Sequence, residues 1–139
     1  MPETNIHFID SNIWLYSLLD TDEAEKTESA QVLIKTSEAV VSSQVVGEVC
    51  ANLVKKAKMP EAEIRKFIEG IYARHRVMEL DMRVFLFASE LREEYSLSFW
   101  DSLIVSAAFL SGAEIIYSED MQEGLVVRDS LKIINPFKS

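Results

Sequence analysis

The chain has 139 residues, of which 48% are hydrophobic and 27% are charged, close to the averages for globular domains, so the composition excludes a disordered chain. Its length fits a single domain over residues 1–139, and no apolar run approaches the ~18 residues that a membrane span needs. The net charge of −9 argues against a surface that binds nucleic acid all over, and the N-terminal residues carry no targeting signal, so we expect a cytoplasmic protein.

Strand-like and helix-like segments alternate from one end of the chain to the other. The sequence predicts strands at 7–10, 39–42, 77–80, 114–118 and 131–135. Helical periodicity predicts helices at 22–36, 44–57, 60–73, 84–95 and 103–110. This order favours an α/β fold, and we expect a three-layer α/β/α sandwich around a central parallel sheet of four to five strands.

The last predicted helix differs from the others in its polarity. Between Leu103 and Leu110 only Ser106 is polar, whereas the other helical segments carry one apolar stripe. We therefore expect this helix to be covered on most sides and to end at Gly112, a residue type that favours helix C-termini.

Positive charge is concentrated in one part of this acidic chain. Residues 55–76 hold seven of the fourteen Lys and Arg residues and only three acids. A solvated helical face explains most of these cations. A patch that guides a nucleic acid strand is the alternative for a few of them.

Acidic residues stand near the ends of the predicted strands. Asp10 closes the first strand and the pair Glu119 and Asp120 follows the fourth, so a parallel sheet brings Asp10 and at least one of this pair to the same edge. Glu48 lies in the second turn of the helix after the second strand, and Asp101 lies at the start of the apolar helix. Converging carboxylates repel one another, and hard divalent cations such as Mg²⁺ or Mn²⁺ compensate that charge. The pattern predicts a metal site at this edge.

Each of these acids also has a structural explanation. Asp10 fits the N-cap of a helix that begins near Asn12, and Asp101 stands three residues after Ser98, as in a capping box. Glu48 fits a solvated helix flank, and Asp120 fits a turn. Taken singly, the structural explanations are the stronger; taken together, they leave four acids at one predicted edge to coincidence.

Other kinds of catalytic site lack their parts. The sequence holds no Ser-His-Asp order, no phosphate-binding Gly-rich loop and no Cys-His metal spacing. Six aromatic residues in helical segments are read as core or subunit contacts rather than a platform for stacking bases: Trp14, Phe85, Phe87, Phe99, Trp100 and Phe109.

Four segments of the chain resemble, in order, the PIN-domain ribonucleases, and most nearly the VapC-type toxins of toxin–antitoxin pairs. These segments are FIDSNIWLY, SSQVVGEV, FWDSLIVSAAFLSGAEIIYSEDMQEG and IINPF. The resemblance covers nearly the whole chain. Its most specific part runs from Trp100 to Asp120, where acids bracket a helix and a strand.

The resemblance implies roles for particular residues. Asp10, Glu48, Asp101 and Asp120 match the acidic quartet of the family, which binds Mg²⁺ or Mn²⁺ and cuts RNA. By the same resemblance, three further residues orient these carboxylates through hydrogen bonds: Ser11, Asn12 and Ser118. The family also implies a homodimer and an antitoxin protein that inserts a segment into the site.

The implied reaction is metal-assisted hydrolysis of an RNA phosphodiester bond. Arg65 and Lys66, in the basic segment, are candidate contacts to the flanks of the RNA strand. A receiver domain of a signalling relay is a rival, but Asn135 stands where that family needs a lysine and Asp10 has no neighbouring acid. An aspartate-nucleophile phosphatase needs an acid where Asn12 stands. A non-catalytic binding module of the same fold is the third alternative.

Overall fold

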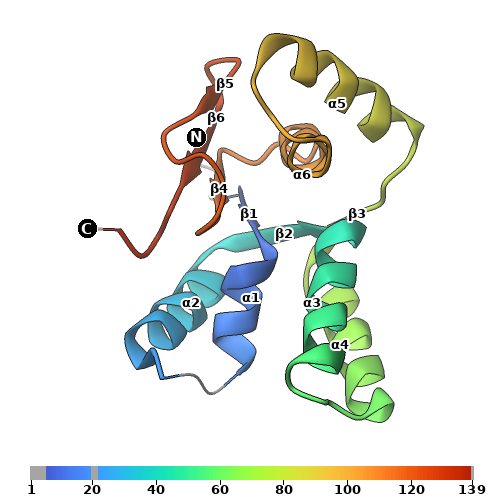
Figure 1. Cartoon of the computed structure of the whole chain (residues 1–139), viewed down its shortest axis with the longest axis vertical. Helices are drawn as coiled ribbons and strands as arrows, with labels where there is room; N and C mark the ends of the chain where they lie inside the picture. Colours follow the sequence, from blue (N-terminus) through green and yellow to red (C-terminus); the bar gives the residue numbers. More distant parts are fainter. Residues whose placement is uncertain (1–5, 20–21, 139) are drawn as a thin grey trace.

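A computed structural model gives the arrangement of the chain and describes residues 6–19 and 22–138. The first residues, in which the sequence predicts no targeting signal, lie outside this described part. Figure 1 shows a central sheet with helices on both sides. Within the described residues, no helix has the length and apolar character needed to cross a membrane.

Six strands form the sheet, in the order β3-β2-β1-β4-β6-β5. Their bounds are β1 (Ile6–Ile9), β2 (Glu38–Ser42), β3 (Arg76–Met78), β4 (Ile115–Tyr117), β5 (Val126–Val127) and β6 (Leu131–Ile134). Five strands are parallel to one another, which confirms the predicted parallel sheet, and β5 pairs antiparallel with β6 at the edge. The sequence did not predict β5, because two residues are too few to show an alternating pattern.

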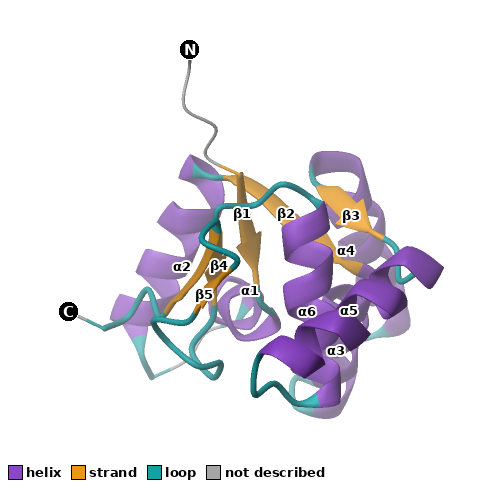
Figure 2. Cartoon of the chain, turned by 90° about the horizontal axis from the view of Figure 1, so that it is seen from above, coloured by secondary structure: helices purple, strands orange, loops and turns teal. Residues whose placement is uncertain are grey.

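Six helices connect the strands. Their bounds are α1 (Ser11–Leu18), α2 (Ala24–Thr36), α3 (Ser43–Lys55), α4 (Glu61–Arg74), α5 (Met82–Glu94) and α6 (Phe99–Leu110). In Figure 1, α1 to α4 lie on one face of the sheet and α5 and α6 lie on the other, and Figure 2 shows the same layers from above. The predicted three-layer α/β/α sandwich is therefore confirmed.

Polar side chains fix where several helices begin. The side chains of four N-cap residues each accept a hydrogen bond from a backbone amide in the first turn: Asp10 for α1, Ser42 for α3, Asp81 for α5 and Ser98 for α6. At the other end of α6, Gly112 has a φ of 84°, the left-handed conformation that glycine adopts without strain. The helix stops there, as its sequence predicts.

Helix α6 forms the centre of the core on its side of the sheet. Every residue from Ser102 to Ala108 is buried, in agreement with the nearly continuous apolar sequence. Ser106, one of two serines in that run, donates a 2.8 Å hydrogen bond to the carbonyl of Val84 on α5. Its burial therefore leaves no hydroxyl unpaired.

The strand order reverses direction at β1. The chain proceeds from β1 to β2 and β3 on one side, whereas β4 and β6 lie on the other side of β1. In parallel α/β sheets, ligands bind beyond the carboxyl ends of the strands at such a reversal. Asp10 directly follows β1 and Ser118 directly follows β4, so both stand at this point.

Candidate active site

Asp10 and Ser118 meet where β1 and β4 end side by side. Ile9 is paired with Tyr117 in the sheet, and the amide of Asp10 donates a 3.0 Å hydrogen bond to the carbonyl of Tyr117. The Ser118 hydroxyl then donates a 2.7 Å hydrogen bond to Oδ2 of Asp10. The register of the two strands thus fixes this contact.

Asp10 is both a helix cap and a buried acid. Its Oδ1 accepts a 2.8 Å hydrogen bond from the amide of Ser11, and only 5% of the residue is exposed. Burial raises the pKa of Asp10, and the charges of Asp101 and Asp120 raise it further, whereas the hydrogen bonds from Ser118 and Ser11 lower it. Asp10 is therefore a helix cap, as one explanation predicts. Capping alone does not explain why this carboxylate is buried near two other acids.

The two adjacent acids after β4 have different partners. Oδ2 of Asp120 accepts a 3.1 Å hydrogen bond from Nδ2 of Asn12, and the amide of Asp120 donates to the Ser118 hydroxyl at 3.3 Å. Glu119 instead accepts from the Tyr16 hydroxyl at 2.9 Å and pairs with Lys26 at 2.5 Å. Glu119 is thus neutralised by a neighbouring cation, and Asp120 is the acid of this pair whose charge reaches Asp10.

Glu48 and Asp101 approach the same place from α3 and α6. Burial raises the pKa of Glu48, and the charges of Asp10 and Asp101 raise it further. Hydrogen bonds from Gln44 and Ser11 lower it in part. Asp101 therefore influences both of the other acids, although its helix lies on the opposite face of the sheet from α3 (Figure 1).

The capping explanation of Asp101 concerns its backbone. The Ser98 hydroxyl accepts a 3.1 Å hydrogen bond from the amide of Asp101, as an N-cap does. Among the described residues, no amide donates to the carboxylate of Asp101. The reciprocal half of a capping box is therefore missing, and the carboxylate is available for another purpose.

The three predicted orienting residues each contact an acid of the quartet. Ser118 binds Asp10, Asn12 binds Asp120, and Ser11 binds Asp10 through its amide and Glu48 through its hydroxyl. Sequence reasoning missed Gln44, one turn before Glu48. Its Nε2 lies 3.5 Å from Oε2 of Glu48 and 3.3 Å from the Trp100 carbonyl oxygen.

The donor set agrees in part with a hard divalent cation. Its atoms are carboxylate oxygens, the ligands that Mg²⁺ and Mn²⁺ prefer, and the buried Oε1 of Gln44 has no hydrogen-bond partner among the described residues. However, no three His, Cys, Asp or Glu side chains of the described part are grouped closely enough to hold an ion. The charges of these acids act on one another at the carboxyl ends of the strands, but their oxygens are not close enough together to form a complete set of metal ligands.

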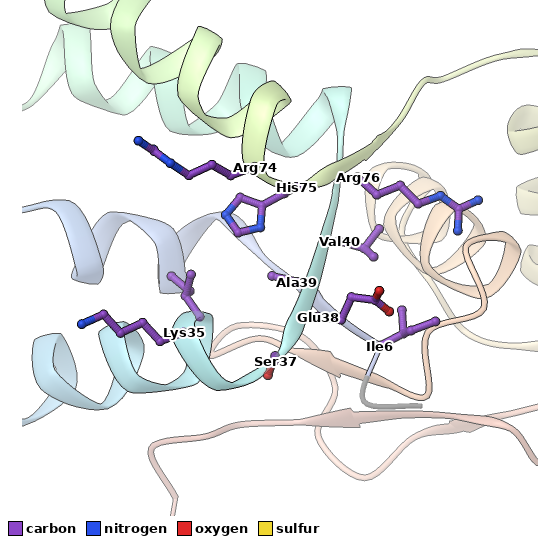
Figure 3. Close-up of a pocket in the computed structure, with 10 residues that line it drawn as sticks. Ile6, Lys35, Ser37, Glu38, Ala39, Val40, Arg74, His75 and Arg76 are labelled. Carbon is purple, nitrogen blue, oxygen red and sulfur yellow. The ribbon is translucent and has the colours of Figure 1, made fainter. Parts of the chain in front are cut away.

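A cavity of about 620 Å³ lies elsewhere, at the amino ends of the strands (Figure 3). Ile6 and Glu38, which begin β1 and β2, contribute to its lining together with Lys35, Arg74 and His75. Lys35 and Arg74 stand in the last turns of α2 and α4, where cations stabilise the helix dipole. Asp10 stands at the other end of the strands, after the carboxyl end of β1, so this cavity is separate from the acid cluster.

Arg65 and Lys66 lie on α4 and both are exposed. Lys66 pairs weakly with Glu63, at 3.4 Å, one turn earlier on the same helix. Such a pair between exposed side chains contributes little to stability. These cations are therefore accessible, but they are not part of the acid cluster.

The sequence matches the family described as PIN domain over residues 7–122. Among solved structures, the chain is similar to a toxin–antitoxin complex from Klebsiella pneumoniae, at 14% identity and a TM-score of 0.67, over 96% of this chain and 99% of that one. It is also similar to VapC20 of Mycobacterium tuberculosis, a toxin that cleaves the sarcin–ricin loop, at 18% identity and a TM-score of 0.64, over 82% and 89%.

A third similar structure is VapBC2 from Rickettsia felis bound to a promoter DNA fragment, at 17% identity and a TM-score of 0.63, over 94% of this chain and 99% of that one. No curated protein sequence matches the chain. The family match extends over most of the chain, and the solved structures share its fold over nearly their whole length. The receiver-domain alternative is thereby set aside, and the chain belongs to the PIN domain family.

Proposed function

We propose that the chain is a divalent-metal-dependent endoribonuclease that hydrolyses RNA phosphodiester bonds, with Asp10, Glu48, Asp101 and Asp120 as metal-binding catalytic acids. The observation that carries this proposal is the position of Asp10. It is a nearly buried acid at the reversal point of a parallel sheet, and its pKa is raised by burial and by two acids from other elements. A protein retains such a costly group where its charge has a use.

Asp10, Glu48, Asp101 and Asp120 would hold the divalent ions, whose chemistry would be to activate water and to stabilise charge on the phosphate. Asp10 is the buried acid of the four, Glu48 and Asp101 are half-buried, and Asp120 is exposed. By donating to Asp10, Ser118 favours its charged form against the effect of burial, and Asn12 orients the carboxylate of Asp120 by donating to it. The protein part of the mechanism is thus the binding and orientation of anionic ligands.

The experiment is an RNA cleavage assay with the purified chain in Mn²⁺, in Mg²⁺ and in EDTA. We expect cleavage in either metal, no cleavage in EDTA, and a loss of more than about 100-fold for Asp10→Asn, a larger effect than removal of an outer hydrogen-bond partner produces. If the wild-type chain leaves a mixed pool of cellular RNAs intact in Mn²⁺, the chain is instead a non-catalytic module of the same fold.

We also propose that the chain is the toxin of a toxin–antitoxin pair. The support is its similarity to solved structures of such complexes, in Klebsiella pneumoniae and Rickettsia felis. Expression of the chain should arrest growth, and expression of Asp10→Asn should not. A folded, active chain that cuts RNA in vitro and leaves growth unchanged would indicate a processing or decay nuclease.

A homodimer, a cytoplasmic location and a single domain over residues 1–139 remain part of this proposal. The molar mass in solution, measured by light scattering, tests the dimer. Limited proteolysis tests the domain, because a second domain would be released by cleavage at the linker between them.

A further inference from the structure

Two large aromatic side chains are exposed at the start of α6, directly before Asp101. Trp100 is 60% exposed and Phe99 is 46% exposed, whereas the seven residues that follow Asp101 are buried. Phe99 and Trp100 are therefore not core residues, which leaves a subunit contact, the other part of the prediction for them, untested. Exposed aromatic surface gains nothing from the fold and is a feature of binding surfaces.

The backbone of Trp100 is tied to the acid cluster. Nε2 of Gln44 lies 3.3 Å from the Trp100 carbonyl oxygen and 3.5 Å from Oε2 of Glu48, so one amide connects both residues. Asp101, the next residue, raises the pKa of Glu48 and of Asp10. The backbone that carries the indole therefore lies beside the acids at which the phosphodiester is proposed to react.

A cation accompanies the aromatic pair. The rings of Phe99 and Trp100 meet edge to face, with centroids 5.1 Å apart, and the Arg92 guanidinium lies 4.7 Å from the centroid of Phe99. Arg92 is held there by a 2.7 Å hydrogen bond to the Ser102 hydroxyl. Exposed aromatic rings together with an Arg are the side chains on which proteins stack unpaired bases.

We propose that Trp100 is a specificity-determining residue that stacks on an unpaired RNA base next to the scissile phosphodiester. This inference rests on the proposed ribonuclease function and names its substrate class: RNA whose base is free to leave its own stack, in preference to a continuous duplex. A π-stacking contact accepts any base, so Trp100 selects unpaired structure rather than a particular nucleotide.

A second copy of the chain is the competing occupant of this surface. Exposed apolar residues also stand on the neighbouring helix α5, where Leu86 is 58% exposed and Met82 is 75% exposed. Two observations favour RNA for Trp100: its attachment to Glu48 through Gln44, and the nearby positive charge of Arg92 in an acidic chain. The experiment below gives different results for the two occupants.

Intrinsic fluorescence measures the stacking directly, because the chain has two tryptophans of very different exposure. Trp14 is 5% exposed and its Nε1 donates to the Ile9 carbonyl, so an added ligand reaches Trp100. In Mg²⁺ and in the Asp10→Asn background, which keeps the RNA intact, we expect a single-stranded RNA to quench the emission more than the same sequence in a duplex. The quenching should vanish in Trp100→Phe.

Cleavage kinetics provide the second measurement. Trp100→Ala should raise KM by roughly 5- to 150-fold, the loss expected from one base–aromatic stack, with a smaller change in kcat. Trp100→Phe and Trp100→Tyr should restore most of the affinity. The matched control is Leu86→Ala, at a second exposed apolar residue, which should leave KM unchanged. The oligomeric state of every variant, measured as its molar mass in solution, should be that of the wild type.

Three outcomes overturn the inference. If Trp100→Ala and Leu86→Ala both lower the molar mass and impair cleavage alike, the surface joins two copies of the chain. If fluorescence polarisation detects RNA binding and the RNA is cut, but the tryptophan emission does not change, the ribonuclease proposal stands and the stacking is wrong. If the wild-type chain neither binds nor cuts RNA in Mn²⁺, the ribonuclease proposal fails and this inference fails with it.

Discussion

The hydroxyl of Ser118 donates a 2.7 Å hydrogen bond to Oδ2 of Asp10 and so joins two residues that are 108 positions apart in the sequence. The hydroxyl oxygen of Ser118 also accepts hydrogen bonds from the amides of Asp120 and Met121, at 3.3 and 3.2 Å. One hydroxyl therefore holds both the buried acid after β1 and the turn that carries Asp120. Since Ser118 is itself fully buried, water has no access to replace it.

Ser118→Ala should lower both stability and activity. It leaves the amides of Asp120 and Met121 without the Ser118 acceptor and Oδ2 of Asp10 without the Ser118 donor, so we expect the free energy of unfolding to fall by about 1–3 kcal/mol. Cleavage should fall roughly 10- to 100-fold, the usual effect of losing a residue that orients a metal ligand. Urea denaturation and the RNA cleavage assay measure the two effects.

Ser106→Ala is the matched control for this variant. Ser106 is also fully buried and donates one hydrogen bond, to the Val84 carbonyl, but it lies between α5 and α6 and contacts none of the four acids. Its loss should reduce stability by a similar order without reducing kcat. Equal loss of kcat in both variants would mean that Ser118 acts only through general stability.

Asp10→Asn should gain stability relative to the wild type as the pH rises from 4 to 7. Burial raises the pKa of Asp10 above its usual value of 3.8. Between 3.8 and that raised pKa, the unfolded chain has released a proton that the folded chain keeps, so wild-type stability falls with rising pH and stays reduced above it. Asparagine carries no such charge. Urea denaturation across this pH range, in EDTA, measures the difference.

Glu94→Gln provides a control of opposite sign. The Arg128 guanidinium, which is hydrogen-bonded to Glu94, lowers the pKa of that carboxyl. Ionisation of Glu94 therefore favours the folded state, and the wild type should gain stability relative to Glu94→Gln as the pH rises. If the difference in unfolding free energy between Asp10→Asn and the wild type does not change with pH over the same range, the burial of Asp10 has no electrostatic cost.

The sequence was sufficient to predict that Asp10 and an acid after β4 lie at the same end of the sheet, because parallel strands place their carboxyl ends side by side. Asp10 and Asp120 are such residues, and the structure brings their charges within reach of each other. Helical spacing, in contrast, does not reveal which side of an apolar helix end is covered, so it could not distinguish a core position for Trp100 from a position at a contact surface, and the core position is excluded by its exposure. The cap and site explanations of Asp10 were treated as alternatives, although one carboxylate has oxygens enough for both.

Spacing also left Glu119 and Asp120 equivalent, because the partners that distinguish them come from distant residues. Lys26 and Tyr16 neutralise Glu119, and Asn12 orients Asp120. We therefore expect Asp120→Asn to lose most of the cleavage activity and Glu119→Gln to retain it. Equal loss of cleavage activity in the two variants would mean that both acids belong to the site, contrary to the contacts that distinguish them.

Mn²⁺ should stabilise the wild-type chain by about 2.7 kcal/mol when its concentration is 100 times the dissociation constant, because only the folded state gathers the acids. Asp101→Asn should reduce this gain, since it removes one charge that acts on both Asp10 and Glu48. Thermal unfolding with and without Mn²⁺ and titration calorimetry measure it. Glu28→Gln, at an exposed acid on α2, is the control and should leave the gain unchanged. A wild-type chain that takes up no Mn²⁺ would contradict the metal-dependent mechanism.

Charge reversal of Arg65 and Lys66 tests whether the basic helix holds the flanks of the RNA. Both residues are exposed, and Lys66 has only a weak pair with Glu63, so their replacement by Glu should leave the fold intact. If they bind phosphates, affinity for RNA should fall for all sequences alike, and the slope of its dependence on salt should become shallower by about one for each phosphate that is no longer neutralised. Lys132→Glu, at an exposed position on β6, changes the net charge without changing α4 and should have a smaller effect. If Lys132→Glu and the reversal of Arg65 and Lys66 lower the affinity for RNA equally, the effect comes from net charge. If the reversal of Arg65 and Lys66 leaves the affinity unchanged, these cations belong to the solvated face of an amphipathic helix.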